Sequence, residues 1–97
     1  MALKVVWTRR AEEVFSQIIN YLETNWTDRE IRNFIQKTYQ FIELLKINSY
    51  LLEPSKTMKN THRGPINRFT IATYQVKPRK GTIVLLNIRS AKQKPLK

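Results

Sequence analysis

Cysteine is absent from this chain of 97 residues, and histidine occurs once, as His62. Without thiols there is no disulfide framework and no thiolate metal site, and a single imidazole provides no histidine pair for zinc or copper. The sequence therefore predicts no metal and no other cofactor.

Long apolar segments are also missing. No run approaches the roughly 20 apolar residues that span a bilayer, and the first residues lack the apolar stretch of a signal peptide. We therefore expect a cytoplasmic protein without a membrane partner. Its length allows one domain, covering residues 1–97, with one modest core.

Acidic residues are missing from the second half of the chain. Up to Glu53, seven Lys or Arg residues balance seven Asp or Glu residues, whereas residues 54–97 contain eleven basic residues and no acid, giving a net charge of +11. Surfaces that serve solubility mix both signs. A merely solvated basic face would explain the cations but not the missing acids, so the pattern favours an anionic partner.

The first half predicts a strand followed by two helices. Residues 4–7 are β-branched or aromatic, and Thr8 can cap a helix that the apolar spacing extends over residues 9–24. The segment Thr27-Asp28-Arg29-Glu30 is a capping box, and the apolar face that follows it reaches Leu45. The short connection predicts a tight antiparallel helical hairpin.

The second half predicts a loop and antiparallel strands. Residues 48–61 have no periodicity and are expected to form a loop, and 62–67 is a poor strand candidate because of Gly64-Pro65. Residues 70–77 and 82–89 are better strands, joined by a turn in which Gly81 supplies a positive φ.

Strand 82–89 is apolar on both alternating sets of residues, which predicts a central strand between the helical hairpin and a second layer or groove. The expected fold class is α+β, in the order β-α-α-β-β-β, with the helical hairpin packed on a mainly antiparallel sheet.

Four short segments resemble a known family in the same order along the chain. They are Val5-Val6-Trp7-Thr8-Arg9-Arg10-Ala11, Ile18-Ile19-Asn20-Tyr21-Leu22 with Trp26-Thr27, Tyr74-Gln75-Val76, and Ser90-Ala91-Lys92-Gln93-Lys94-Pro95. Together with the order of elements, they resemble the RelE/ParE toxin superfamily of type II toxin–antitoxin and plasmid stabilisation systems.

The resemblance implies a toxin that either cuts mRNA on the ribosome or binds DNA gyrase. It also implies a small cognate antitoxin, whose acidic or amphipathic segment would lie across the helices and the basic groove. The chain departs from the family at Ser90 and Lys92, where the family has Asp and Arg, and at Ile66, where its nucleases have Arg. These departures favour the binding branch, because lysine lacks the bidentate fork of arginine.

If the chain is an enzyme, we expect a metal-independent endoribonuclease, which needs a base, an acid and cations for the phosphate. The imidazole of His62 and the hydroxyl of Tyr74 are the candidate proton-transfer and positioning groups. The alternatives are an exposed His62 beside the Gly-Pro turn and a Tyr74 packed for its area. The candidate catalytic cations are Arg63, Arg68 and Lys92, and the candidate target-binding residues are Lys56, Lys59, Arg89 and Lys94.

Two further hypotheses remain open. One is a catalytically inactive binding module with the RelE/ParE fold, which interacts with nucleic acid or protein. The other is a stand-alone nucleic-acid-binding domain, whose binding would depend steeply on salt. Because Phe69 and Tyr74 are the only Phe, Tyr or Trp residues after residue 53, we do not expect sequence-specific reading of single-stranded bases.

Overall fold

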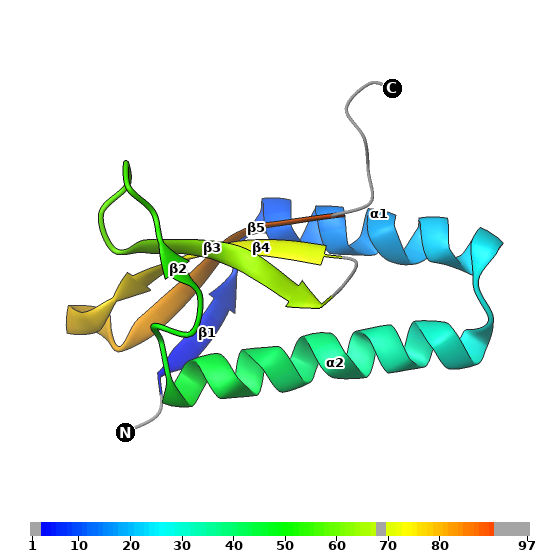
Figure 1. The fold of residues 1–97 in the computed structure, drawn as a ribbon, viewed down its shortest axis with the longest axis horizontal. Helices are drawn as coiled ribbons and strands as arrows, with labels where there is room; N and C mark the ends of the chain where they lie inside the picture. Colours follow the sequence, from blue (N-terminus) through cyan, green and yellow to red (C-terminus); the bar gives the residue numbers. More distant parts are fainter. Residues whose placement is uncertain (1–2, 68–69, 91–97) are drawn as a thin grey trace.

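A five-stranded sheet forms the centre of the computed structural model, which describes residues 3–67 and 70–90 (Figure 1). The strand order is β1-β5-β4-β3-β2, in which β1 runs parallel to β5 and every other pair is antiparallel. The elements are β1 (Lys4–Trp7), α1 (Arg9–Asn25), α2 (Asp28–Ile47), β2 (Glu53–Pro54), β3 (Thr61–Asn67), β4 (Thr70–Lys77), the 3-10 helix η1 (Pro78–Lys80) and β5 (Thr82–Ser90). The expected α+β class and mainly antiparallel sheet are confirmed.

Thr8 fixes the passage from β1 into α1. Its hydroxyl accepts a hydrogen bond from the amide of Ala11 at 3.1 Å, which caps the helix as predicted, and lies 3.0 Å from the carbonyl oxygens of both Leu85 and Leu86. One side chain thus satisfies a helix terminus and ties it to β5.

The predicted capping box at the start of α2 is present. The Glu30 amide donates to the Thr27 hydroxyl at 3.2 Å, and the Thr27 amide donates to the Glu30 carboxylate at 3.0 Å. In the described parts of the chain, neither helix combines the length and the apolar character that crossing a membrane requires.

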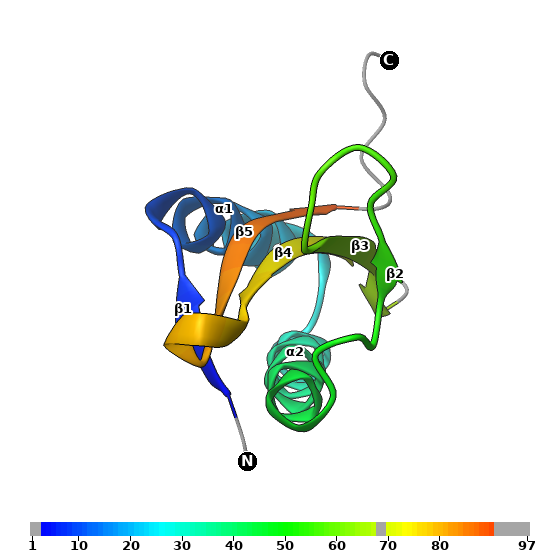
Figure 2. The same ribbon diagram turned by 90° about the vertical axis from the view of Figure 1, so that its left-hand side faces the viewer.

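The two helices form the predicted antiparallel hairpin, with only Trp26 and Thr27 between them, but they do not stay in contact along their whole length. They pack together near their connection, through the buried cluster of Leu22, Ile31 and Phe34, and then diverge. Figure 2 shows the sheet between their separated ends, with α2 against one face and α1 on the other side of β5. The sequence of β5 explains this divergence. Its residues are apolar on both faces of the sheet, so each face needs a packing partner.

The main core lies between α2 and the sheet. Phe41, Ile42 and Leu45 of α2 pack against the inward-facing residues of β4 and β5, which are Ala72, Tyr74, Val76, Ile83, Leu85 and Ile88. As predicted, β5 is an interior strand, flanked by β1 and β4. Gly81 has the expected positive φ of 62° at the hairpin turn.

For the segment before β4, the first strand of the predicted three-stranded run is confirmed, and the prediction of an uninterrupted loop was wrong. Residues 61–67 form a strand despite Gly64 and Pro65, and the predicted loop contains the two-residue strand β2. Gly64 fits because it has no Cβ atom. A Cβ atom at this position would lie 3.2 Å from the Leu52 side chain, which is closer than an ordinary packing contact. Pro65 is tolerated because β2 pairs only with His62 and Arg63, so that beyond them β3 is an edge strand.

Candidate target-binding face

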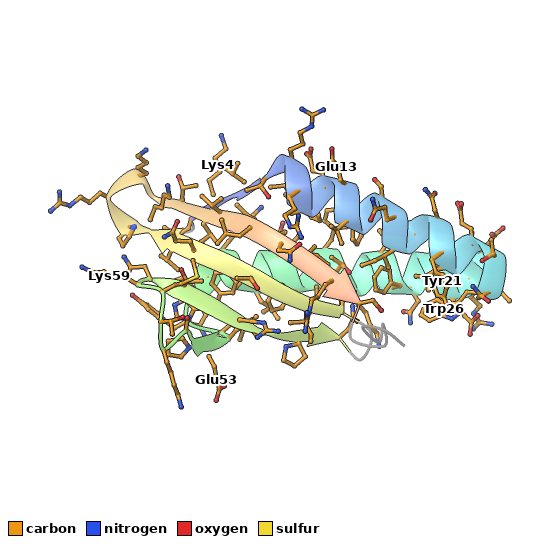
Figure 3. All side chains as sticks on the ribbon, turned by 90° about the horizontal axis from the view of Figure 1, so that it is seen from above. Lys4, Glu13, Tyr21, Trp26, Glu53 and Lys59 are labelled. Atoms are coloured by element: carbon orange, nitrogen blue, oxygen red, sulfur yellow. The ribbon has the colours of Figure 1, made fainter. Side chains whose placement is uncertain are left out.

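The strands β3, β4 and β5 present two chemically different faces. Ala72, Tyr74 and Val76 point toward α2 and are buried, so the alternating residues Thr73, Gln75 and Lys77 point to the opposite face. We call this second side the open face. Figure 3 looks onto it, with α2 behind the sheet.

Two arginines lie on the open face. The register pairs Arg63 of β3 with Thr73, and Thr73 with Asn87 of β5, forming one row across the sheet. Arg89 lies in the next row, opposite Ile71. Neighbouring strands are about 4.8 Å apart, so the Cα atoms of Arg63 and Arg89 are separated by about 10 Å across the sheet and about 7 Å along it.

Among the described residues neither arginine forms an ion pair, although Glu53 of β2 is the register partner of Arg63. Both are exposed, and the ion pairs among residues 3–67 and 70–90 are Arg9–Glu13 and Lys46–Glu43. Arg63 ends the polar row and Arg89 lies in the row beside it, so the open face can bind an anionic surface that reaches both guanidinium groups.

Asn87 adds an unusual polar group to this row. Its Oδ1 atom is buried and has no hydrogen-bond partner. The register shift between Thr73 and Tyr74 places an extra residue in β5 beside Asn87. Bulges of this kind re-aim side chains and are frequent at functional sites.

His62 and Tyr74 lie on the other face, toward α2. His62 is only 3% exposed and Tyr74 is fully buried. Their rings stack with centroids 5.2 Å apart, and Tyr50 packs edge-on against His62 at 5.3 Å. The expected exposed position of His62 beside the Gly-Pro turn is therefore not observed.

Both polar groups hold the segment between α2 and β3. The Tyr74 hydroxyl donates to the Ser49 carbonyl at 2.9 Å and accepts from the Leu52 amide at 3.2 Å. Nδ1 of His62 lies 2.9 Å from the Leu52 carbonyl oxygen. Tyr74 is therefore packed within the sheet, as the alternative for this residue stated. Neither the Tyr74 ring nor the His62 ring lies on the open face.

The pKa of the Tyr74 hydroxyl is raised above its ordinary value of 10.0, because burial disfavours the phenolate, and the hydrogen bond from Leu52 only partly opposes this effect. Since the unfolded chain then loses this proton first, stability should be constant below the unfolded pKa and should fall as the pH rises through it. Urea unfolding of the wild type and Tyr74→Phe between about pH 9 and pH 11 measures this term. The wild type should lose stability more steeply than Tyr74→Phe, and parallel profiles would contradict the assignment.

The structure brings together only some of the predicted site residues. Arg63 and Arg89 share the open face, whereas Lys56 and Lys59 are exposed on the segment between β2 and β3. Lys59 lies toward the end of the sheet where the β4–β5 hairpin turns (Figure 3). The candidates Arg68, Lys92 and Lys94 lie outside the described residues.

Sequence reasoning missed Thr73, Gln75 and Asn87. The signal for the first two was available, since they alternate with the apolar residues 72, 74 and 76 along a predicted strand. The position of Asn87 depends on the bulge in β5, which no alternation pattern reveals.

The fold matches solved structures of toxin–antitoxin proteins. A chain of the chromosomal ParDE TA system from P. aeruginosa has a TM-score of 0.75 and 18% identity, and the match covers 94% of this chain and 98% of that one. A chain of the toxin–antitoxin complex RelBE2 from Mycobacterium tuberculosis has a TM-score of 0.65 and 11% identity, over 96% and 95%. The isolated E. coli RelE toxin has a TM-score of 0.57 and 13% identity, over 96% and 88%.

No protein-family model matches the sequence, and the search of curated proteins gave no match. The likeness to the solved structures is therefore a likeness of fold. The chain has the fold of the RelE/ParE toxins, as its sequence segments predicted.

Proposed function

We propose that this protein is the toxin of a type II toxin–antitoxin module and that it arrests growth by binding its target through the open face. The toxin fold supports the first part of this proposal. The observation that carries the second is the pair of exposed arginines, Arg63 and Arg89, which form no ion pair among the described residues and lie on the side of the sheet away from α2.

Binding is favoured over RNA cleavage by the positions of the candidate proton-transfer groups. A general base must come within hydrogen-bond reach of the proton it removes. His62 and Tyr74 are buried on the face opposite Arg63 and Arg89, and their polar atoms contact the backbone of Ser49 and Leu52. We therefore assign them to holding that segment in place rather than to catalysis.

The target that fits this mode of action is DNA gyrase in the cytoplasm, because the resemblance implies that gyrase-directed toxins act by binding. Ribosome-dependent mRNA cleavage is the competing mechanism. The proposed partner is a small antitoxin with an acidic segment, which would neutralise the cations of the open face.

The test is induced expression with and without the gene adjacent to this one. Expression alone should reduce colony counts, and co-expression of a short acidic neighbour should restore them. The purified chain should then inhibit gyrase supercoiling and leave a reconstituted translation reaction unaffected. Inhibition of translation alone would replace gyrase by the ribosome, and normal growth on induction would favour an inactive binding module.

A further inference from the structure

A shallow hollow of about 470 Å³ lies at the turn between β4 and β5. It is lined by Asn60, Gln75, Val76, Lys77, Pro78, Arg79 and Lys80. Three of these residues are cationic, and none is acidic. The hollow therefore concentrates positive charge at one end of the sheet.

Its polar side chains make no ion pair or hydrogen bond to other described residues. Both ion pairs of the described chain are elsewhere, on α1 and α2. The backbone still holds the hollow in shape, because the Val76 amide donates to the Asn60 carbonyl at 2.8 Å and the Gly81 amide donates to the Pro78 carbonyl at 3.1 Å. Free donors on a fixed backbone form a preorganised surface for hydrogen-bond acceptors.

The hollow continues the open face. Gln75 and Lys77 belong to the same alternating set of β4 residues as Thr73, which lies between Arg63 and Asn87. Lys77 is six residues along β4 from Ile71, the register partner of Arg89, which corresponds to about 20 Å. Cations thus mark both ends of a track of about 20 Å, which equals the rise of about six base pairs along the axis of a DNA duplex.

We infer that the hollow is a second contact surface, which binds the phosphodiester backbone of nucleic acid bound to the target. This inference rests on the proposed function. Lys77, Arg79 and Lys80 would contact phosphates, and Asn60 and Gln75 would donate to the same oxygens. This contact reads no bases, because in the described parts of β3, β4 and β5 the one tyrosine, Tyr74, is buried on the opposite face and no Phe or Trp occurs.

An acidic protein segment is the competing ligand for these cations. Such a segment would need apolar anchors as well as charge, since protein interfaces depend on a few buried apolar or aromatic contacts. Most of the large exposed apolar side chains lie elsewhere, with Leu44, Ile47, Tyr50 and Leu51 gathered at the end of α2 and just after it, and Met58 is the one within two residues of a lining residue, Asn60. The observations therefore favour nucleic acid at the hollow.

The test measures binding of the full chain to fluorescent oligonucleotides, one a DNA duplex and the other a single-stranded RNA, over a series of salt concentrations. The test variant combines Lys77→Gln, Arg79→Gln and Lys80→Gln. The control combines Arg29→Gln, Arg32→Gln and Lys37→Gln on exposed positions of α2, and it removes the same charge.

The slope of log K against log salt should become shallower by about 2 to 3 in the test variant, because each lost phosphate contact changes it by about 0.7 to 0.9. The control should keep the slope of the wild type. The oligonucleotide that binds with the lower Kd shows whether the phosphodiester backbone at the hollow belongs to DNA or to RNA.

Equal slopes for the test variant and the wild type would overturn the inference. A second result would also overturn it: the wild type binds polyglutamate more tightly than either oligonucleotide, and the test variant no longer binds polyglutamate. The ligand of the hollow would then be an acidic protein. A wild type that arrests growth but binds neither oligonucleotide would remove this inference alone. A wild type that binds through the hollow without arresting growth would remove the proposed function alone.

Discussion

Replacing Arg63 and Arg89 together by glutamine is expected to abolish growth arrest. A hydrogen bond to a charged group contributes about 1.5–3 kcal/mol, so losing both contacts should cost about 3–6 kcal/mol of target binding. This corresponds to roughly a hundredfold to ten-thousandfold increase in Kd. Colony counts after induction and inhibition of supercoiling by the purified variant measure the loss.

Two comparisons separate a loss of contact from a loss of charge or of fold. The control Arg29→Gln with Arg32→Gln removes the same charge from exposed positions of α2 and should arrest growth like the wild type. The pair Arg63→Lys with Arg89→Lys keeps the charge but lacks the guanidinium fork, so it should be intermediate. If the glutamine pair still arrested growth at wild-type expression, the open face could not be the binding surface.

Replacing Tyr74 by alanine should be among the most destabilising single substitutions in the chain. The ring is fully buried, and removing a buried aromatic side chain costs about 3–5 kcal/mol. Small domains have total stabilities of about 5–15 kcal/mol, so this variant should be partly unfolded at physiological temperature.

Tyr74→Phe distinguishes packing from hydrogen bonding. It keeps the ring but leaves the Leu52 amide and the Ser49 carbonyl without the hydroxyl, which should cost about 1–3 kcal/mol. Urea unfolding followed by circular dichroism measures both variants, and amide exchange at Leu52 should accelerate in Tyr74→Phe. A Phe variant as stable as the wild type, with Leu52 exchange unchanged, would show that the hydroxyl does not hold this segment.

Most of the fold could be predicted because its signals are local. The cap at Thr8, the capping box at Thr27 and the turn at Gly81 are each set by residues within a few positions of one another. β3 was the least certain of the predicted strands because Gly64 and Pro65 disfavour a strand in general. They are accepted here because of Leu52 packing and an uncovered sheet edge, which are tertiary effects.

The candidate site was less predictable than the fold. Residue chemistry drew attention to His62, Tyr74, Arg63 and Arg89 alike, since each could serve phosphate chemistry. Which face a side chain occupies depends on register, and the register divides these four residues between opposite sides of the sheet. The divergence of α1 from α2 is also set by the sheet between them and not by their connection.

The parallel pairing of β1 with β5 has a consequence for how the protein is made. Lys4 is paired with Thr82 and Trp7 with Leu85, so the earliest strand to be synthesised has no neighbour until the final hairpin emerges from the ribosome. Loop closure of this length is slow, and incomplete chains expose unpaired strand edges. A nascent chain interrupted before Thr82 would therefore lack both the folded sheet and Arg89, so under the proposed function only molecules elongated beyond Arg89 should arrest growth.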